Sequence, residues 1–177
     1  MIKSFYFLLA FFLSAPTIAQ KTVIQDDKLN GIIPLNAEGR LSYNANGKVE
    51  GATKEELFKR ARKWFVKTYN SAKDVLQVND ASAGELIGKG STPTVAKVQR
   101  VTWHNNVNHT LTLDVKDGRY RIELCDFKVD GVLLMNYKLP YIATTQNHYT
   151  ELYTAIDAHN KELIASLEKA LKTADEF

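Results

Sequence analysis

The chain contains very little cysteine, since Cys125 is the only one among its 177 residues. A single cysteine cannot form an intrachain disulfide, so the folded state must be stabilised by packing. The residues around Cys125 are typical of a strand. We therefore expect its thiol to be a small, buried or half-buried side chain rather than a reactive group.

Metal-binding and nucleotide-binding motifs are also missing. The four histidines have no metal-ligand spacing, and no expected helix carries two of them one turn apart. The segment Gly84–Thr92 is rich in glycine, but Gly90 separates Lys89 from Ser91. A phosphate-binding loop requires these two residue types side by side. The sequence therefore predicts neither a metal nor a cofactor.

The chain has neither a strong charge of one sign nor a long apolar run. Its formal net charge is +3 at pH 7, which predicts no nucleic-acid partner. The apolar run from Phe5 to Leu13 is far shorter than the ~20 residues that cross a bilayer as a helix. No later segment approaches that length, so we expect no transmembrane segment.

The N-terminal 19 residues have the pattern of a cleavable signal peptide. Lys3 precedes the apolar run, and Thr17-Ile18-Ala19 offers small residues for cleavage before Gln20. The pattern predicts export to the periplasm or the extracellular space. Residues 20–40 are polar and patternless, and we expect an extended leader there. Residues 41–177 suffice for one domain with one core.

The clearest element is a helix that follows Thr53. Thr53 and Glu56 have the spacing of a capping box, and apolar residues recur at helical spacing from Leu57 to Tyr69. The opposite side of this helix is basic. We interpret it as a solvated face, with an anionic lipid or acidic protein partner as the alternative. The residues of this basic face are Lys59, Arg60, Arg62, Lys63 and Lys67.

The pair Asp117-Gly118 is the strongest turn signal and predicts a hairpin with a two-residue loop. This register puts every apolar residue of the two strands on one face and polar residues on the other. Asp114 then lies opposite Arg121, which adds a favourable charge pair on the polar face. The expected apolar pairs are Val115 with Tyr120, Leu113 with Ile122 and Leu111 with Leu124.

The remaining elements are less regular. A first strand between Leu41 and Val49 is interrupted by Asn44–Gly47, and Val75–Val78 pairs with Leu86–Ile87 in a second hairpin. Val101 and Trp103 suggest another strand that turns at Asn105 and Asn106, with a bulge before Val107. A turn at Asp130-Gly131 leads into a short strand, and a long helix starts between about Thr145 and His148 and continues to the C-terminus.

Three pieces of this pattern resemble a bacterial family known as a domain of unknown function with a TBP-like fold. They are Gly51–Leu57 continuing to Phe65, Asp74–Leu76 with Gly84–Gly90, and Lys116–Arg121. The resemblance covers about Val49 to Lys128. It implies an α+β fold, with an antiparallel sheet of about five strands, one helix after the first strand and a long C-terminal helix packed on the sheet. It implies no activity and no catalytic residues.

The absence of a catalytic pattern favours a non-catalytic module of the bacterial cell envelope that binds a small apolar ligand or another protein. Two alternatives stay open: a secreted hydrolase built around His109, Asp126 or His148, and a structural or assembly component. The sequence leaves the oligomeric state open. The candidates for lining a ligand site are Trp64, Phe65, Tyr69, Trp103, Tyr149 and Tyr153.

Overall fold

The computed structural model describes residues 32–69, 72–98, 101–129, 132–133 and 146–173. The chain has the expected α+β composition. Its elements are β1 (Tyr43–Lys48), α1 (Lys54–Tyr69), α2 (Ala72–Val75), β2 (Leu76–Asp80), β3 (Glu85–Val98), β4 (Val101–Lys116), β5 (Arg119–Val129), β6 (Val132–Leu133) and α3 (Gln146–Lys172).

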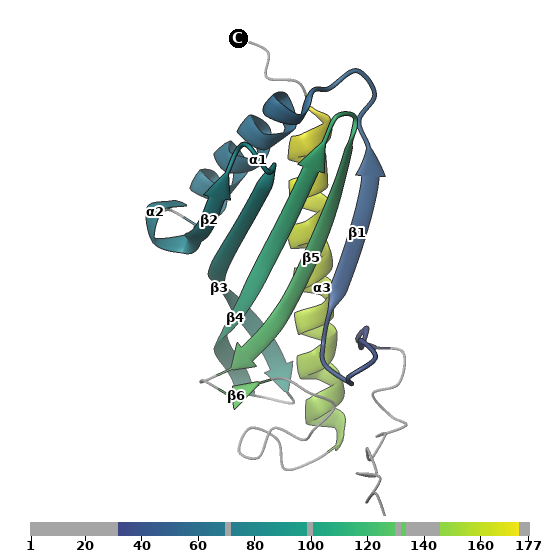
Figure 1. The fold of residues 1–177 in the computed structure, drawn as a ribbon. Coiled ribbons are helices and arrows are strands. Elements are labelled where there is room, and N and C mark those ends of the chain that lie inside the picture. The colour runs from purple at the N-terminus through teal and green to yellow at the C-terminus, as the bar shows by residue number, and fades with distance from the viewer. Residues whose placement is uncertain (1–31, 70–71, 99–100, 130–131, 134–145, 174–177) are drawn as a thin grey trace, which may run out of the picture.

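The strands form one antiparallel sheet of six strands in the order β1-β5-β4-β3-β2, and the short β6 pairs with β5. Both long helices lie behind the same face of this sheet, while no described element covers the other face (Figure 1). We call the helix-covered face the inner face and the uncovered one the outer face. The fold thus has two layers, and its core lies between them.

The predicted capping box starts α1. The Thr53 Oγ1 accepts a hydrogen bond from the Glu56 amide at 3.2 Å, and Glu56 Oε2 accepts one from the Thr53 amide at 2.9 Å. The apolar side of α1 is buried against the sheet and α3. The helix is therefore positioned by both its cap and its apolar stripe, as the sequence indicates.

The hairpin of β4 and β5 has the predicted register, with Lys116 opposite Arg119 and Asp114 opposite Arg121. The apolar residues pair as predicted, and their side chains are buried on the inner face. Because side chains alternate between the two faces, the same register places the polar residues of both strands on the outer face.

The expected interruption of the first strand is wrong, because β1 runs unbroken through Asn44–Gly47 along β5. The two asparagines face outward, where they stay exposed, and Ala45 and Gly47 face the helices. A Cβ atom on Gly47 would overlap the Tyr120 side chain. At Gly47, the ring of Tyr120 on β5 therefore occupies the space that a side chain of β1 would take.

The turn expected at Asn105 and Asn106 is also wrong. The strand β4 passes through both residues, and β3 pairs with it without a shift from Glu85 to Val98. The ladder hydrogen bonds of this long hairpin override a local turn preference of asparagine. The irregularity lies on the other side of β4, where β5 bulges at Asp126 with φ at 54°.

Two glycines of β3, Gly88 and Gly90, permit close packing of α1. A Cβ atom on Gly88 would lie 2.5 Å from Phe65 Cε1, and one on Gly90 would overlap the Tyr69 ring. Both glycines are therefore explained by packing.

The helix α3 begins at Gln146, within the predicted range, and lies across the inner face. Two of its carboxylates accept hydrogen bonds from sheet tyrosines, Asp157 from Tyr43 at 3.1 Å and Glu168 from Tyr120 at 2.8 Å. The Trp64 indole donates to Ser166 at 2.9 Å. These bonds fix α3 to both the sheet and α1.

Residues 32–41 lie within or next to the expected leader. Leu35 forms an isolated bridge with Leu41, and Ile33 is buried against the core. The expected signal peptide and the turn at Asp130-Gly131 lie outside the described residues.

Candidate functional site

The aromatic candidates predicted from the sequence lie mostly in the core. Trp64, Phe65 and Tyr153 are buried, and Trp64 packs edge-on against Phe65 with ring centroids 5.3 Å apart. The Tyr69 ring packs against Phe65 at a tilt of 34°, with ring centroids 5.8 Å apart. The side chains of the other two candidates, Trp103 and Tyr149, lie outside the described part of the structure. The rings that are described pack on one another, as core residues do.

His109 is buried beneath the helices and has both ring nitrogens occupied. Its Nε2 lies 2.8 Å from the Tyr69 hydroxyl, and its Nδ1 lies 3.3 Å from the Val107 carbonyl oxygen. Burial lowers the pKa of His109 to about 4. The imidazole is therefore neutral near pH 7. It accepts a hydrogen bond from the Tyr69 hydroxyl and donates one to the Val107 carbonyl, so His109 has a structural role.

The pairing of His109 with Asp126, which a hydrolase site would use, does not form. The bulge in β5 turns Asp126 outward, where it is exposed, while His109 points inward. The side chain of His148 lies outside the described residues. Within the described part of the chain, no group of three or more His, Cys, Asp or Glu residues could hold a metal ion.

Cys125 lies half-buried on the outer face, as expected from the sequence. Burial, together with the nearby charges of Asp126 and Glu123, raises the pKa of this thiol to about 11. The thiolate is the nucleophilic form, so Cys125 is a poor nucleophile near neutral pH.

The outer face carries a row of three cations at the closed end of the β4–β5 hairpin. Lys48 on β1 and Lys116 on β4 both lie directly opposite Arg119 on β5, the strand between them. Directly opposite residues have Cβ atoms about 4.5–5.5 Å apart, and like charges in such positions are destabilising. No described carboxylate forms a salt bridge with any of the three. We call these residues the cation row.

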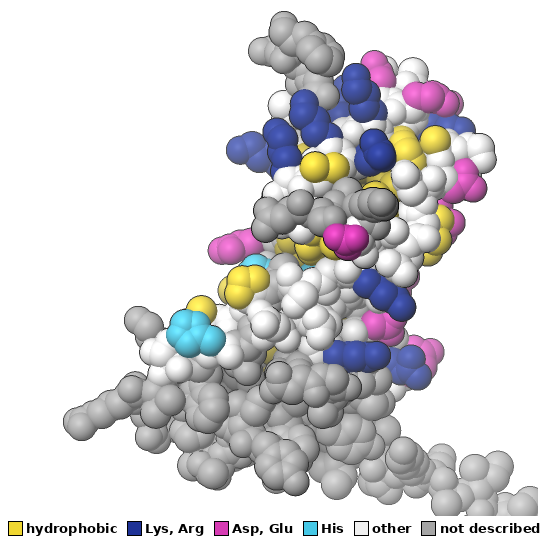
Figure 2. Space-filling view, turned by 90° about the vertical axis from the view of Figure 1, so that its left-hand side faces the viewer, with side chains coloured by type: hydrophobic (Ala, Val, Ile, Leu, Met, Phe, Trp, Pro, Cys, Tyr) yellow, Lys and Arg dark blue, Asp and Glu magenta, His cyan; other side chains and the backbone are white. Residues whose placement is uncertain are grey.

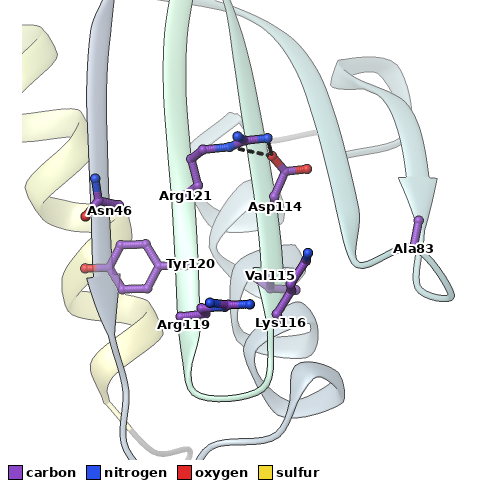
Figure 3. Close-up of a pocket in the computed structure, with 8 residues that line it drawn as sticks. All are labelled: Asn46, Ala83, Asp114, Val115, Lys116, Arg119, Tyr120 and Arg121. Atoms are coloured by element: carbon purple, nitrogen blue, oxygen red, sulfur yellow. Dashed lines mark hydrogen bonds and ion pairs between the residues drawn. The ribbon is translucent and has the colours of Figure 1, made fainter.

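The pocket beside the cation row is an open concavity on the outer face with a volume of about 540 Å³. Figure 3 shows Lys116 and Arg119 next to each other near the turn, with Asn46 on the neighbouring strand. Some lining comes from inner-face residues of the same strands. The residues that line this pocket are Asn46, Ala83, Asp114, Val115, Lys116, Arg119, Tyr120 and Arg121.

The next pair of outer-face residues along the β4–β5 hairpin, Asp114 and Arg121, has opposite charges. Arg121 donates two hydrogen bonds to Asp114 Oδ2, at 3.0 Å from Nε and 2.7 Å from Nη2. The hydrogen bond and charge of Asp114 raise the pKa of Arg121. This arginine is therefore held by an internal partner, whereas the cation row has none among the described residues.

The hairpin end that carries the cation row is fixed to the start of α1. Asp117 Oδ1 accepts a hydrogen bond from the Lys54 amide at 2.8 Å, and the Gly118 amide donates to the Ala52 carbonyl at 2.9 Å. Gly118 also accepts from the Val49 amide at 2.9 Å. The positive φ of Gly118, 68°, suits the turn. The cation row therefore sits on rigid backbone.

This geometry makes the outer pocket suited to an anionic group. Adjacent cations repel one another, and an anion that binds between them relieves the repulsion while it adds its own attraction. Sequence reasoning missed the site. The turn at Asp117-Gly118 already placed Lys116 opposite Arg119, but Lys48 joins the row only through the pairing of β1 with β5.

The basic residues of α1 lie on the side of the helix that faces away from the core. Lys59, Arg62, Lys63 and Lys67 are exposed, and Arg60 donates a hydrogen bond to the Leu171 carbonyl of α3 at 2.8 Å. Figure 2 shows Lys and Arg side chains gathered over this part of the molecule. Among the described residues, no helix has the length and apolar character needed to cross a membrane.

Comparisons with known proteins agree with the geometry. Residues 43–130 match a family described as a domain of unknown function (DUF4468) with TBP-like fold. The structure is similar to the crystal structure of a TBP-like protein from Parabacteroides distasonis ATCC 8503, with 17% identity and a TM-score of 0.63. The match covers 81% of this chain and 99% of that chain.

A second solved structure is similar as well, that of a DUF4468 family protein from Bacteroides ovatus ATCC 8483. The identity is 16% and the TM-score 0.62, over 83% of this chain and 94% of that chain. No protein with a curated description matches the sequence. At such identities the likeness establishes the fold, and an activity has to be argued from the site itself.

Proposed function

We propose that this chain, whose residues 43–130 belong to the DUF4468 family with a TBP-like fold, is a non-catalytic binding module. Its binding site is the pocket on the outer face, and its partner is an acidic segment of another protein. The N-terminal signal pattern favours export, so we place the module in the cell envelope.

The observation that carries this proposal is the cation row. Lys48, Arg119 and Lys116 occupy neighbouring strands at directly opposite positions, so their repulsion lowers the stability of the fold. Folding alone does not require three cations there. Carboxylates of a partner would compensate the charge, and a site on rigid backbone needs little reorganisation to bind them.

An acidic peptide segment fits the site better than the apolar ligand that the aromatic residues suggested. The outer pocket is open and lined by charged side chains, whereas the aromatic rings pack tightly in the core. A peptide that crosses the strands can place successive carboxylates over the row, because neighbouring strands are about 4.8 Å apart. The open face leaves its path free of the described helices.

The hydrolase alternative has weaker support. His109 is neutral and saturated with hydrogen bonds, and the thiol of Cys125 has a raised pKa. Burial raises the pKa of Tyr69, the hydrogen-bond partner of His109, and the carboxylates near Cys125 raise the thiol pKa instead of activating it. The geometry therefore favours binding over acid–base or nucleophilic chemistry.

Fluorescence anisotropy with a labelled glutamate oligomer tests the proposed function, with a glutamine oligomer of equal length as the neutral probe. The full chain should bind the glutamate oligomer, and its affinity should fall as salt is added. Neutralising two members of the row, in Lys116→Gln/Arg119→Gln, should weaken binding about tenfold, which corresponds to about 1.4 kcal/mol.

The matched control is Arg62→Gln/Lys67→Gln, which removes the same charge from the helix side. This variant should bind the glutamate oligomer as the unaltered chain does. Equal weakening in both variants would mean that only net charge matters, and the proposed site would then be wrong. Equal binding of the glutamine oligomer would contradict the anionic partner.

A further inference from the structure

The structure assigns a second, separate interaction surface to the protein, formed by the exposed cations of α1 and the end of α3. We propose that this surface docks on an anionic lipid membrane. The proposal does not rest on the outer-face site, because the two surfaces share no residue.

The cations of α1 form one stripe along the helix. Lys59, Lys63 and Lys67 follow one another at four-residue steps, and Arg62 lies three residues after Lys59. The four side chains therefore project from the same side over about two turns. The acidic residues of α1, Glu55 and Glu56, lie in its first turn. The rest of the stripe therefore has one sign of charge.

The stripe continues onto α3. Arg60, Lys63 and Lys67 line a notch of about 190 Å³ together with Trp64, Ala170 and Thr173 of the two helices. Lys169 precedes Ala170 and is exposed in the last turns of α3. The notch thus brings three cationic side chains together at one point, which is the chemistry that binds a phosphate group. The Thr173 hydroxyl donates to the Lys169 carbonyl at 2.9 Å and takes no part.

The residue types favour a lipid surface over a protein partner. Lysine is depleted at the cores of protein interfaces, where aromatic residues and methionine are enriched, yet lysine supplies most of this surface. Anionic lipids move laterally, so a membrane can match a lysine-rich surface without a fixed complementary shape. Each Lys or Arg near an anionic surface strengthens binding about fivefold.

An exposed valine within the stripe adds an apolar contact. The side chain of Val66 is 46% exposed between Arg62 and Lys67. The other large apolar residues of α1 are buried in the core, so the helix cannot lay an apolar face into the bilayer. The docking is therefore electrostatic and peripheral.

Vesicle co-sedimentation tests this proposal with phosphatidylcholine vesicles that contain or lack phosphatidylglycerol. The measured quantity is the ratio of binding to the two vesicle types. Every protein compared carries the same N-terminal region, so any contribution of its apolar run is equal in all. The full chain should prefer the anionic vesicles, and the preference should decrease when salt screens the charges.

Two variants with the same loss of three charges separate the helix surface from the outer face. Arg62→Gln/Lys67→Gln/Lys169→Gln should lower binding to anionic vesicles about a hundredfold, from about fivefold per charge. Lys48→Gln/Lys116→Gln/Arg119→Gln should bind them as the unaltered chain does. Circular dichroism of both variants checks that each is folded.

Equal losses in the two variants would overturn the proposal, because net charge alone would then explain vesicle binding. The absence of any preference for phosphatidylglycerol would overturn it too. Neither result bears on the glutamate oligomer, whose binding depends on the cation row. The proposal for the outer-face site and the proposal for the helix surface can therefore be disproved independently of each other.

Discussion

The two faces of the sheet follow different rules. The inner face carries large apolar side chains that are fully buried, such as Leu113, Ile122 and Leu124. The hydroxyls of its Tyr43 and Tyr120 donate to carboxylates of α3. The outer face instead places three cations side by side. Folding explains the first face, and the second includes an arrangement that opposes folding. That contrast directs attention to the outer face as the site of function.

Replacing an isoleucine by alanine on each face of the sheet gives the largest expected difference in stability. Ile122→Ala removes a fully buried side chain and should lower the free energy of unfolding by about 2–5 kcal/mol. Ile87→Ala acts on the half-buried outer face and should cost less than about 1.5 kcal/mol. Urea denaturation of both variants measures the difference. Equal losses would show that the outer face is covered in solution.

The buried histidine of the inner face predicts a dependence of stability on pH. His109 has a folded-state pKa of about 4 against an ordinary 6.5, so the unfolded chain binds more protons between these values. The stabilisation is complete above about pH 6.5 and decreases by about 3 kcal/mol as pH falls to 4. Thermal or urea denaturation across this range measures it.

An NMR titration of the imidazole provides the direct control for this pH effect. His109 should stay neutral down to about pH 4, whereas the exposed His104 serves as the comparison in the same spectrum. A midpoint for His109 near its ordinary value would contradict the buried, hydrogen-bonded ring.

Close packing on the inner face predicts an intermediate effect for a single methyl group. Gly88→Ala places a Cβ atom 2.5 Å from Phe65 Cε1, so the ring must move, at a cost of about 1–3 kcal/mol. The adjacent variant Lys89→Ala lies on the exposed side of the same strand and should be nearly neutral. If Gly88→Ala is neutral as well, α1 is not packed as tightly on β3 as described.

The smallest expected effect has the opposite sign and belongs to the outer face. Arg119→Gln removes the central charge of the cation row, so it should raise the free energy of unfolding by about 0.2–1 kcal/mol while weakening the binding of acidic peptides. Asn46→Gln, beside the row and neutral, is the control for a change of side chain. A loss of stability in Arg119→Gln would show that the row has no net repulsion.

Local signals were sufficient wherever short-range chemistry decides the conformation. The capping box at Thr53, the apolar stripe of α1 and the turn at Asp117-Gly118 predicted their elements and their register correctly. The predictions for β1 and for Asn105 were wrong, because these polar segments become strands only through ladders with β5 and β3. Backbone pairing partners distant in the chain leave no local pattern.

The two candidate sites also differ in whether local sequence patterns reveal them. The basic side of α1 was visible from helical spacing alone, since residues one turn apart share a side. The cation row was not, because Lys48 is separated from its neighbours by about 70 residues and reaches them only by pairing with β5. Likewise, His109 and Asp126 were candidates for a hydrolase site, and the bulge in β5 turns Asp126 to the face opposite His109.

The sequence by itself determined the α+β class, the two amphipathic helices, the central hairpin and the likeness to a TBP-like domain. Periodicity, capping and turn chemistry act over a few residues, so they can be read directly from the chain. The tertiary structure alone decided which charges become neighbours, which polar groups are buried and which face stays uncovered. Those properties depend on strand pairing and layer packing, which bring together residues that are far apart in the sequence.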